Sequence, residues 1–233
     1  MTENKFEIFM NCENPETAAK YMENYPFLAG ITINPMMIAR LKRTDYFNIL
    51  KEMRAAIGNR KLFSQVISRD SEGMLKEADL IREAGGENTV VKVPAIEAGM
   101  KVIKTLSDRG IATCGTLCTS TIQGVMALEA GADYIVPFYF HMLNDNLDPV
   151  TVTKELVAFS KMLGRGKVMT AAHRTIEQFG ECLALGVHCC TLNPGFIDDG
   201  MANPCVVKNL NEFLGAWDEV FQGKTILDLA GEQ

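Results

Sequence analysis

Residues 89–118 read TVVKVPAIEAGMKVIKTLSDRGIATCGTLC and contain one complete unit of the predicted fold. The short apolar or β-branched runs 89–95 and 112–118 predict two strands, and the helical periodicity of 98–109 predicts a helix between them. Gly110 follows that helix, where a left-handed residue is favoured. A strand, a helix and a second strand in this order are typical of a parallel βαβ unit.

The same alternation runs through the whole chain. The predicted strands are Lys5–Asn11, Gly30–Asn34, Leu62–Ser68, Thr89–Ala95, Ala112–Cys118, Tyr134–Phe140, Lys167–Ala172 and Cys189–Pro194. The predicted helices are Pro15–Asn24, Pro35–Ile57 with a candidate break near Thr44, Glu72–Ala84, Ala98–Arg109, Thr121–Ala130, Val150–Leu163, Ile176–Leu185 and Val206–Phe221. Eight strand–helix pairs favour a closed α/β fold, the (β/α)8 TIM barrel, and the alternative is an open doubly wound sheet.

End signals support several of these helices. Proline at or near the first turn predicts helix starts at Asn14-Pro15, Asn34-Pro35 and Asp148-Pro149. Glycines suited to a left-handed residue at a helix C-terminus are Gly85, Gly110, Gly131, Gly164 and Gly186.

Composition limits the classes of function. The 233 residues suit one barrel domain spanning 1–233, and 47% hydrophobic residues exclude a disordered chain. A net charge of −6 argues against a nucleic-acid surface, so a small molecule is the expected partner.

The seven cysteines lack a disulfide or zinc spacing and are expected to be free thiols. Without a signal peptide in residues 1–10 or an apolar run long enough for a membrane, we expect a cytoplasmic protein.

Polar residues occur at inward positions near the carboxyl ends of the predicted strands, the catalytic end of a barrel. They are Asn11, Thr32, Asn34, Gln65, Lys92 and Thr116. Asn34 could instead be the N-cap of the helix that begins at Pro35. Gln65 and Thr116 could instead satisfy backbone groups inside the barrel.

Lys92 interrupts the apolar run Val90-Val91-Lys92-Val93-Pro94. A buried ammonium must find partners or lose its proton, and the neutral amine is a nucleophile that forms an iminium with a carbonyl. We therefore interpret Lys92 as catalytic. The alternative is a buried structural ion pair.

Two other groups follow the last strands. His173 and Arg174 lie where barrels often bind anions, although they could be solvated loop residues. The run His188-Cys189-Cys190 resembles a metal site, but consecutive strand residues face opposite sides, so no metal is expected.

Several segments together resemble the short transaldolases, in particular the fructose-6-phosphate aldolase-like group. These are Gly30-Ile31-Thr32-Ile33-Asn34-Pro35, Leu62-Phe63-Ser64-Gln65-Val66, Val90-Val91-Lys92-Val93-Pro94, Gly115-Thr116, residues 130–138 (AGADYIVPF) and Thr151-Val152-Thr153. The resemblance runs from about Phe6 to Phe221. It implies class I chemistry without a cofactor, in which Lys92 forms a Schiff base with a ketose and retains a dihydroxyacetone unit.

The resemblance also implies roles for other residues. Gln65 and Thr116 would hold a catalytic water, and Asn34 would contact the hydroxyls of the bound unit. Phe138 stands at an aromatic position where phenylalanine is the transaldolase-like choice. The family's ring assembly, with a decamer as one candidate, implies a homo-oligomer in which the C-terminal helix packs on a neighbour. The stripe of Phe213, Trp217, Val220 and Phe221 fits that role.

Three positions depart from the family pattern. Asn11 replaces an aspartate linked to proton transfer, and an amide cannot act as a base. Ala172 replaces a serine, and His141 replaces an arginine, while Arg174 still matches a basic position. We expect altered substrate choice, such as another sugar phosphate or 6-deoxy-6-sulfofructose. Two alternatives stay open: a non-catalytic sugar-phosphate-binding barrel, and an unrelated barrel isomerase or lyase.

Overall fold

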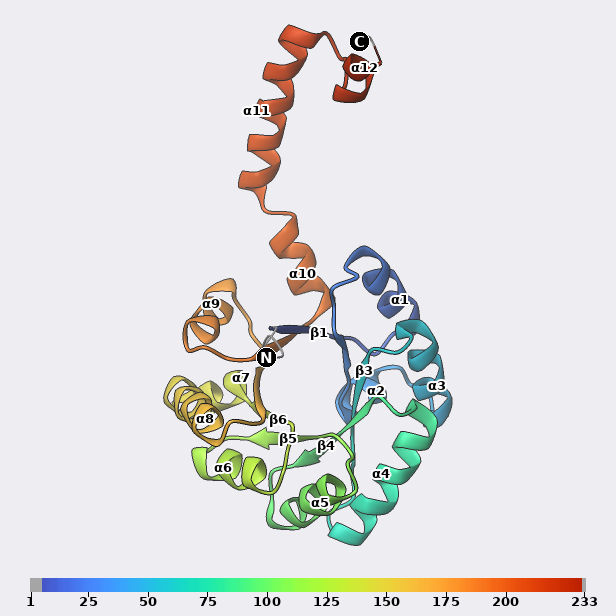
Figure 1. The fold of residues 1–233 in the computed structure, drawn as a ribbon, viewed down its shortest axis with the longest axis vertical. Coiled ribbons are helices and arrows are strands. Elements are labelled where there is room, and N and C mark those ends of the chain that lie inside the picture. Colours follow the sequence, from blue (N-terminus) through green and yellow to red (C-terminus); the bar gives the residue numbers. More distant parts are fainter. Residues whose placement is uncertain (1–5, 232–233) are drawn as a thin grey trace. The chain divides into compact units, whose positions relative to one another are not determined.

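The computed structural model describes residues 6–231, and within them eight parallel strands form a closed barrel in chain order (Figure 1). The strands are β1 (Glu7–Asn11), β2 (Gly30–Thr32), β3 (Lys61–Gln65), β4 (Thr89–Pro94), β5 (Thr113–Cys118), β6 (Tyr134–Pro137), β7 (Lys167–Thr170) and β8 (Cys189–Leu192). β8 pairs with β1, with Phe9 opposite Thr191. This pairing confirms the barrel and excludes the open sheet.

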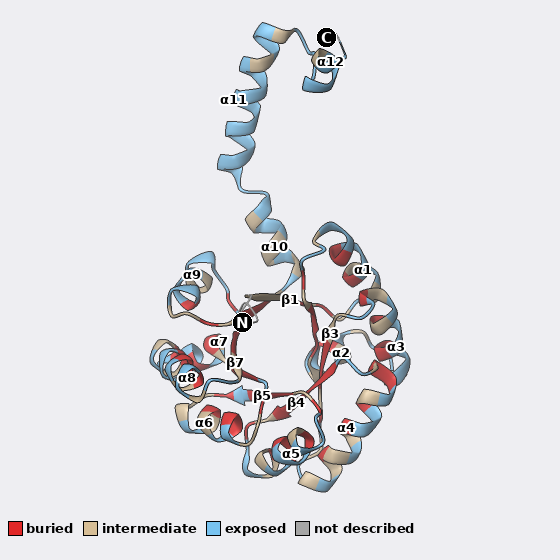
Figure 2. Cartoon of the chain, viewed as in Figure 1, coloured by how far each residue is buried: buried red, intermediate tan, exposed pale blue. Residues whose placement is uncertain are grey.

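Helices surround the barrel, and their buried residues face it (Figure 2). They are α1 (Pro15–Asn24), α2 (Pro35–Arg40), α3 (Tyr46–Ile57), α4 (Ser71–Gly85), α5 (Glu97–Asp108), α6 (Thr121–Glu129), α7 (Tyr139–Asn144), α8 (Pro149–Leu163) and α9 (Ile176–Ala184). The break predicted near Thr44 is confirmed, because α2 ends at Arg40 and α3 begins at Tyr46. The three proline helix starts are confirmed as well, since the side chains of Asn14, Asn34 and Asp148 each accept a backbone N–H of the first turn.

Several local predictions were wrong. The third strand ends at Gln65 rather than Ser68. The sixth strand ends at Pro137 rather than Phe140, and α7 begins at Tyr139. Pro137 has no N–H to continue the ladder. Gly85 is the last residue of α4, and the left-handed residue is Gly86, with φ +81°. Gly85 is required for a different reason: a Cβ there would lie 2.5 Å from the Thr89 hydroxyl.

An aromatic cluster fills the middle of the barrel. The rings of Phe9, Phe63 and Tyr134 are all buried and pack edge to face, with centroids 4.9 to 6.0 Å apart. This edge-to-face arrangement suits the quadrupoles of the rings.

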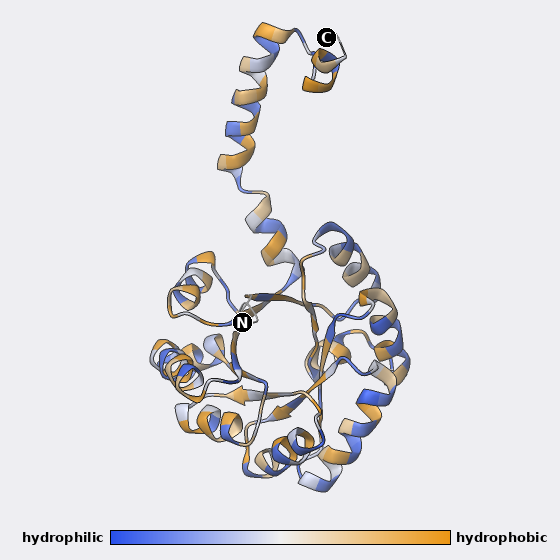
Figure 3. Ribbon diagram, in the orientation of Figure 1, coloured by the Kyte–Doolittle hydropathy of each residue, from blue (hydrophilic) through white to orange (hydrophobic). Residues whose placement is uncertain are grey.

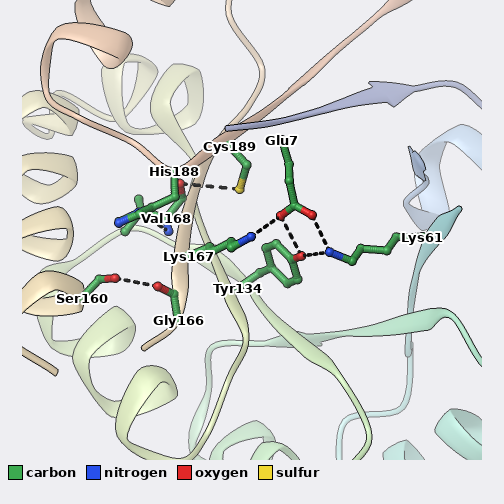
Figure 4. Close-up of polar contacts among 9 residues, drawn as sticks. All are labelled: Glu7, Lys61, Tyr134, Ser160, Gly166, Lys167, Val168, His188 and Cys189. Atoms are coloured by element: carbon green, nitrogen blue, oxygen red, sulfur yellow. Dashed lines mark hydrogen bonds and ion pairs between the residues drawn. The ribbon is translucent and has the colours of Figure 1, made fainter. Parts of the chain in front are cut away.

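Charged groups close the amino-terminal end of the barrel (Figure 4). Lys61 and Lys167 both donate to the carboxylate of Glu7, the latter at 2.7 Å, and the Tyr134 hydroxyl donates to it at 3.0 Å. Burial acts to raise the pKa of Glu7, but the hydrogen bonds from Lys167 and Lys61 outweigh it and lower the pKa. Burial and the adjacent Glu7 raise the pKa of Tyr134. The network joins the first residues of β1, β3, β6 and β7.

The chain divides after Pro194 into two compact units. Beyond the barrel, α10 (Pro194–Met201) is followed by α11 (Pro204–Phe221) and α12 (Ile226–Ala230). Apolar and polar residues alternate along these helices (Figure 3), and the apolar ones are largely exposed. The predicted C-terminal helix is confirmed, whereas the single domain spanning 1–233 stays a prediction. None of the helices in the described part of the chain has the length and apolarity needed to cross a bilayer.

Candidate active site

A cavity of about 80 Å³ lies at the carboxyl ends of the strands and contains Lys92. Lys92 sits in β4, opposite Gln65 of β3 and Cys114 of β5. The cavity is lined by Asn11, Thr32, Asn34, Phe63, Lys92, Cys114, Val136, Phe138, His141, Met169, Ala171, Ala172 and Thr191. Seven of the predicted site residues therefore meet there: Asn11, Thr32, Asn34, Lys92, Phe138, His141 and Ala172.

Lys92 is 8% exposed, and within residues 6–231 no carboxylate forms an ion pair with it. Burial lowers the pKa of its ammonium. The nearby Cys114 does not offset this, because burial raises the pKa of that thiol to about 12 and keeps it neutral. Lys92 is thus a buried amine that faces a cavity, and burial makes its neutral, nucleophilic form easier to reach than that of a solvated lysine. The described residues therefore do not support the alternative that Lys92 belongs to a structural ion pair.

Three side chains on neighbouring strands form a hydrogen-bonded relay beside Lys92. The Thr32 hydroxyl donates to Asn11 Oδ1 at 3.1 Å, and it lies 2.6 Å from the hydroxyl of Thr191. Both threonines are buried. The relay joins the last residues of β1 and β2 to β8, so the barrel itself fixes the position of Asn11.

Asn34, which follows β2, and Phe138, which follows β6, both line the cavity. Asn34 Oδ1 accepts the Met37 backbone N–H at 3.0 Å, so Asn34 is both the N-cap of α2 and part of the cavity lining. The rings of Phe138 and His141 lie 4.9 Å apart. Phe138 is the N-cap of α7 and His141 lies in the first half of that helix, so the turn from β6 into α7 brings both rings to the cavity.

Four predicted site residues do not line this cavity. Gln65 borders a neighbouring apolar cavity of about 410 Å³, which also includes Asn34. Thr116 is fully buried, and its hydroxyl has no hydrogen-bond partner among the described residues. His173 and Arg174 lie on the segment after β7.

His173 and Arg174 have different surroundings. His173 is buried, its Nε2 lies 2.7 Å from the Thr170 hydroxyl, and its ring packs against Phe179. Burial lowers the pKa of His173 to about 4, so the ring is neutral at pH 7 and carries no charge for an anion. The Arg174 guanidinium stacks on the ring of Phe140 at 4.1 Å and is exposed. Arg174 is the remaining cation of the pair.

Six cavity residues were missed by the sequence analysis: Phe63, Cys114, Val136, Met169, Ala171 and Thr191. Five are apolar or weakly polar and look like ordinary core residues. Thr191 could have been found from the sequence. It lies two residues after Cys189 in the last predicted strand, so both side chains point into the barrel.

Comparison with known proteins identifies the family. The profile of the family described as "Transaldolase/Fructose-6-phosphate aldolase" matches residues 11–226. A "Probable fructose-6-phosphate aldolase" of Streptococcus pneumoniae is 33% identical over 94% of this chain and 100% of its own length. A "Probable transaldolase" of Anaeromyxobacter sp. is 31% identical over 82% of this chain and 88% of its own.

Solved structures agree on the fold. The structure titled "Native KDPGal structure" has a TM-score of 0.56 at 16% identity and covers 82% of this chain and 84% of that one. At this identity the likeness concerns the barrel alone. The profile match over nearly the whole chain carries more: the chain belongs to the transaldolase/fructose-6-phosphate aldolase family and is an enzyme, a transaldolase or a class I aldolase.

Proposed function

We propose that Lys92 forms a Schiff base with a ketose and passes the resulting dihydroxyacetone unit to an aldehyde. The observation that carries the proposal is a buried amine of lowered pKa, without an ion pair among residues 6–231, that faces a cavity lined by hydrogen-bonding groups. Such an amine attacks a ketone readily, whereas a solvated lysine at pH 7 is almost wholly protonated.

The proposed steps balance without a cofactor. The amine attacks the ketose carbonyl carbon, and loss of water gives an iminium. The bond between C3 and C4 then breaks, its electron pair moves into the iminium to form an enamine, and the C4 hydroxyl loses its proton as an aldehyde leaves. Asn11 cannot accept that proton, because an amide is no base. Following the family resemblance, we assign it to a water held by Gln65 and Thr116.

We further propose that the substrate carries a terminal anion. Asn34 and Thr32 would bind hydroxyls of the three-carbon unit, while His141 and Arg174 would face the distal end of the sugar, near Ala172 and His173. A sugar phosphate and the sulfonate 6-deoxy-6-sulfofructose both provide such an anion. Phe138, rather than tyrosine, favours transfer over simple release.

The decisive experiment is reduction with borohydride in the presence of dihydroxyacetone or a ketose phosphate. Mass spectrometry of the digested protein should show the reduced three-carbon adduct on the peptide that contains Lys92. K92M should give no adduct, and K101M, which alters a surface lysine of α5, should react like the wild type. A wild-type protein that gives no adduct with any of a broad ketose panel would overturn the proposal.

The same samples test the non-catalytic alternative. A binding barrel would be stabilised thermally by sugar phosphates in both wild type and K92A and would turn over none of them. Turnover that is lost in K92A excludes it.

A further inference from the structure

The relay of Asn11, Thr32 and Thr191 determines which way the Asn11 amide faces. The relay contains three oxygens: Asn11 Oδ1 and the hydroxyl oxygens of Thr32 and Thr191. The hydroxyl hydrogens of Thr32 and Thr191 each need one of these oxygens as an acceptor. With Asn11 Oδ1 toward Thr32, Thr191 donates to Thr32 and Thr32 donates to Asn11, so both hydrogens are used. With the amide reversed, Thr32 would donate to Thr191, and the Thr191 hydrogen would have no acceptor in the relay.

The other end of the amide follows from this. Since Oδ1 is turned toward Thr32, the Nδ2 group of Asn11 is turned away from it, and no hydrogen bond from Nδ2 to any of residues 6–231 occurs. Asn11 is half-buried and lines the cavity that contains Lys92. An ionised carboxylate at this place would only accept hydrogen bonds, whereas Nδ2 only donates them.

We propose that Thr191, acting through Thr32, is a positioning residue that holds the Asn11 amide so that Nδ2 donates to the carbonyl oxygen of the incoming aldehyde. This inference rests on the proposed function and adds a determinant of its specificity. The site is thereby adapted to add a bound three-carbon unit to an aldehyde, because a donor at this place stabilises charge on the aldehyde oxygen.

In the addition step, the C=C π pair of the enamine forms the new bond to the aldehyde carbon, the nitrogen lone pair of Lys92 restores the iminium, and the carbonyl π pair moves to the aldehyde oxygen. Asn11 stabilises that negative charge by its hydrogen bond and transfers no proton. Water supplies the proton that the oxygen finally takes. Hydrolysis of the iminium then frees the amine and the product.

The test compares T191V, which keeps the shape and removes the hydroxyl, with T191S, which restores the hydroxyl. T113V is the matched control, because Thr113 is also a buried strand threonine and its hydroxyl has no partner among the described residues. Two quantities are measured for each: the kcat/KM for D-glyceraldehyde 3-phosphate as acceptor with a dihydroxyacetone donor, and the rate of borohydride trapping with dihydroxyacetone alone.

T191V should lower kcat/KM for the aldehyde about fivefold, the effect expected of one neutral hydrogen bond. T191S and T113V should stay near the wild type, and trapping should change little in all three, because it does not involve the aldehyde oxygen. N11D should also lower kcat/KM for the aldehyde, and its pH profile should gain a limb from the new carboxyl group.

Two results would overturn the inference while the proposed function stands: a T191V enzyme with wild-type kcat/KM for the aldehyde, or a T191S enzyme as impaired as T191V, in each case with normal trapping. Absence of trapping in the wild type is a different result, because it overturns the proposed function and this inference with it.

Discussion

At the scale of single residues, Lys92 favours reactivity at the expense of stability. The residue is 8% exposed, and its amine borders the cavity without a hydrogen bond to any of the described residues. A polar group removed from water without a partner costs about 1–3 kcal/mol. Replacing Lys92 by the apolar methionine of similar length should therefore raise the free energy of unfolding at pH 7 by an amount of that order. Urea unfolding of K92M, with K101M as control, measures this, and a K92M protein less stable than the wild type would contradict it.

The lowered pKa of Lys92 also predicts a pH dependence. Schiff-base formation needs the neutral amine, so the rate of borohydride trapping should rise with pH through the pKa of Lys92 and then level off. Because burial lowers that pKa, the inflection should lie below pH 10.5, the ordinary value of a lysine. Trapping rates measured from pH 6 to 11 show the inflection, and one at or above 10.5 would refute the role of burial.

Arg174 provides a prediction about the substrate. Its guanidinium is exposed and held over Phe140, whereas the neighbouring His173 is neutral at pH 7. R174M should raise KM for a phosphorylated acceptor about tenfold, since a charge-assisted hydrogen bond contributes about 1.5–3 kcal/mol. KM for unphosphorylated glyceraldehyde is the internal control and should not change. Equal effects on both acceptors would indicate that Arg174 acts on the loop and not on the anion.

The residues found from the sequence are those that break a pattern. Lys92 interrupts an apolar run, and Asn11 and Thr32 are polar at strand ends, so each stood out. Thr191 did not, because threonine is common in strands and its importance depends on a hydrogen bond across the closure of the barrel. His173 could be located but not characterised, since only the packed structure reveals that its ring is buried and neutral.

At the scale of elements, strand ends were harder to predict than strands. The run from Tyr134 to Phe140 is apolar throughout, so its hydrophobic pattern does not mark the change from β6 to α7, and Pro137 was the available signal for the end of the strand. The left-handed glycines after α5, α6, α8 and α9 were found correctly: Gly110, Gly131, Gly164 and Gly186. Of the adjacent Gly85 and Gly86, only the structure distinguishes the one needed for close packing from the one needed for its φ angle.

The charged network at the amino-terminal end couples strands that are distant in sequence. Glu7 of β1 accepts from Lys61 of β3 and Lys167 of β7, and it is the most buried of the three side chains. E7Q should lower the free energy of unfolding at pH 7 by about 1–3 kcal/mol, because the two ammonium groups lose their charged partner. E83Q, which alters an exposed glutamate of α4, should have no effect.

The pH dependence distinguishes this cause from a packing defect. The folded-state pKa of Glu7 is lowered, so its stabilising contribution is present above the pKa of the unfolded chain and is lost as the pH falls through the folded-state value. The difference between E7Q and the wild type should therefore shrink below about pH 4, the unperturbed range of a glutamate. A difference that stays constant down to pH 3 would show that charge is not responsible.

At the scale of the whole molecule, the alternation of strand and helix was sufficient to predict the barrel. Each βα unit leaves one sheet edge and one apolar face unsatisfied, and eight units in sequence satisfy both most simply by closing into a barrel, although an open doubly wound sheet was the alternative. No comparable rule predicts how the residues after Pro194 pack. Of their helices, α11 was predicted from periodicity, whereas α10 and α12 were not. The packing partner of α11 could not be predicted, because a buried stripe within the chain and one between subunits have the same pattern.

The exposed face of α11 argues for assembly of several copies. Val206, Leu210, Phe213 and Leu214 are all more than half exposed, Phe213 at 72%. A set of large apolar side chains at helical spacing is typical of a protein interface. We therefore predict a homo-oligomer, with a mass by light scattering that is a multiple of 25.7 kDa. F213D should shift that mass toward the monomer, because it places a charge in the buried interface, while D218N on the same helix should leave it unchanged. A wild-type mass of 25.7 kDa would refute the prediction.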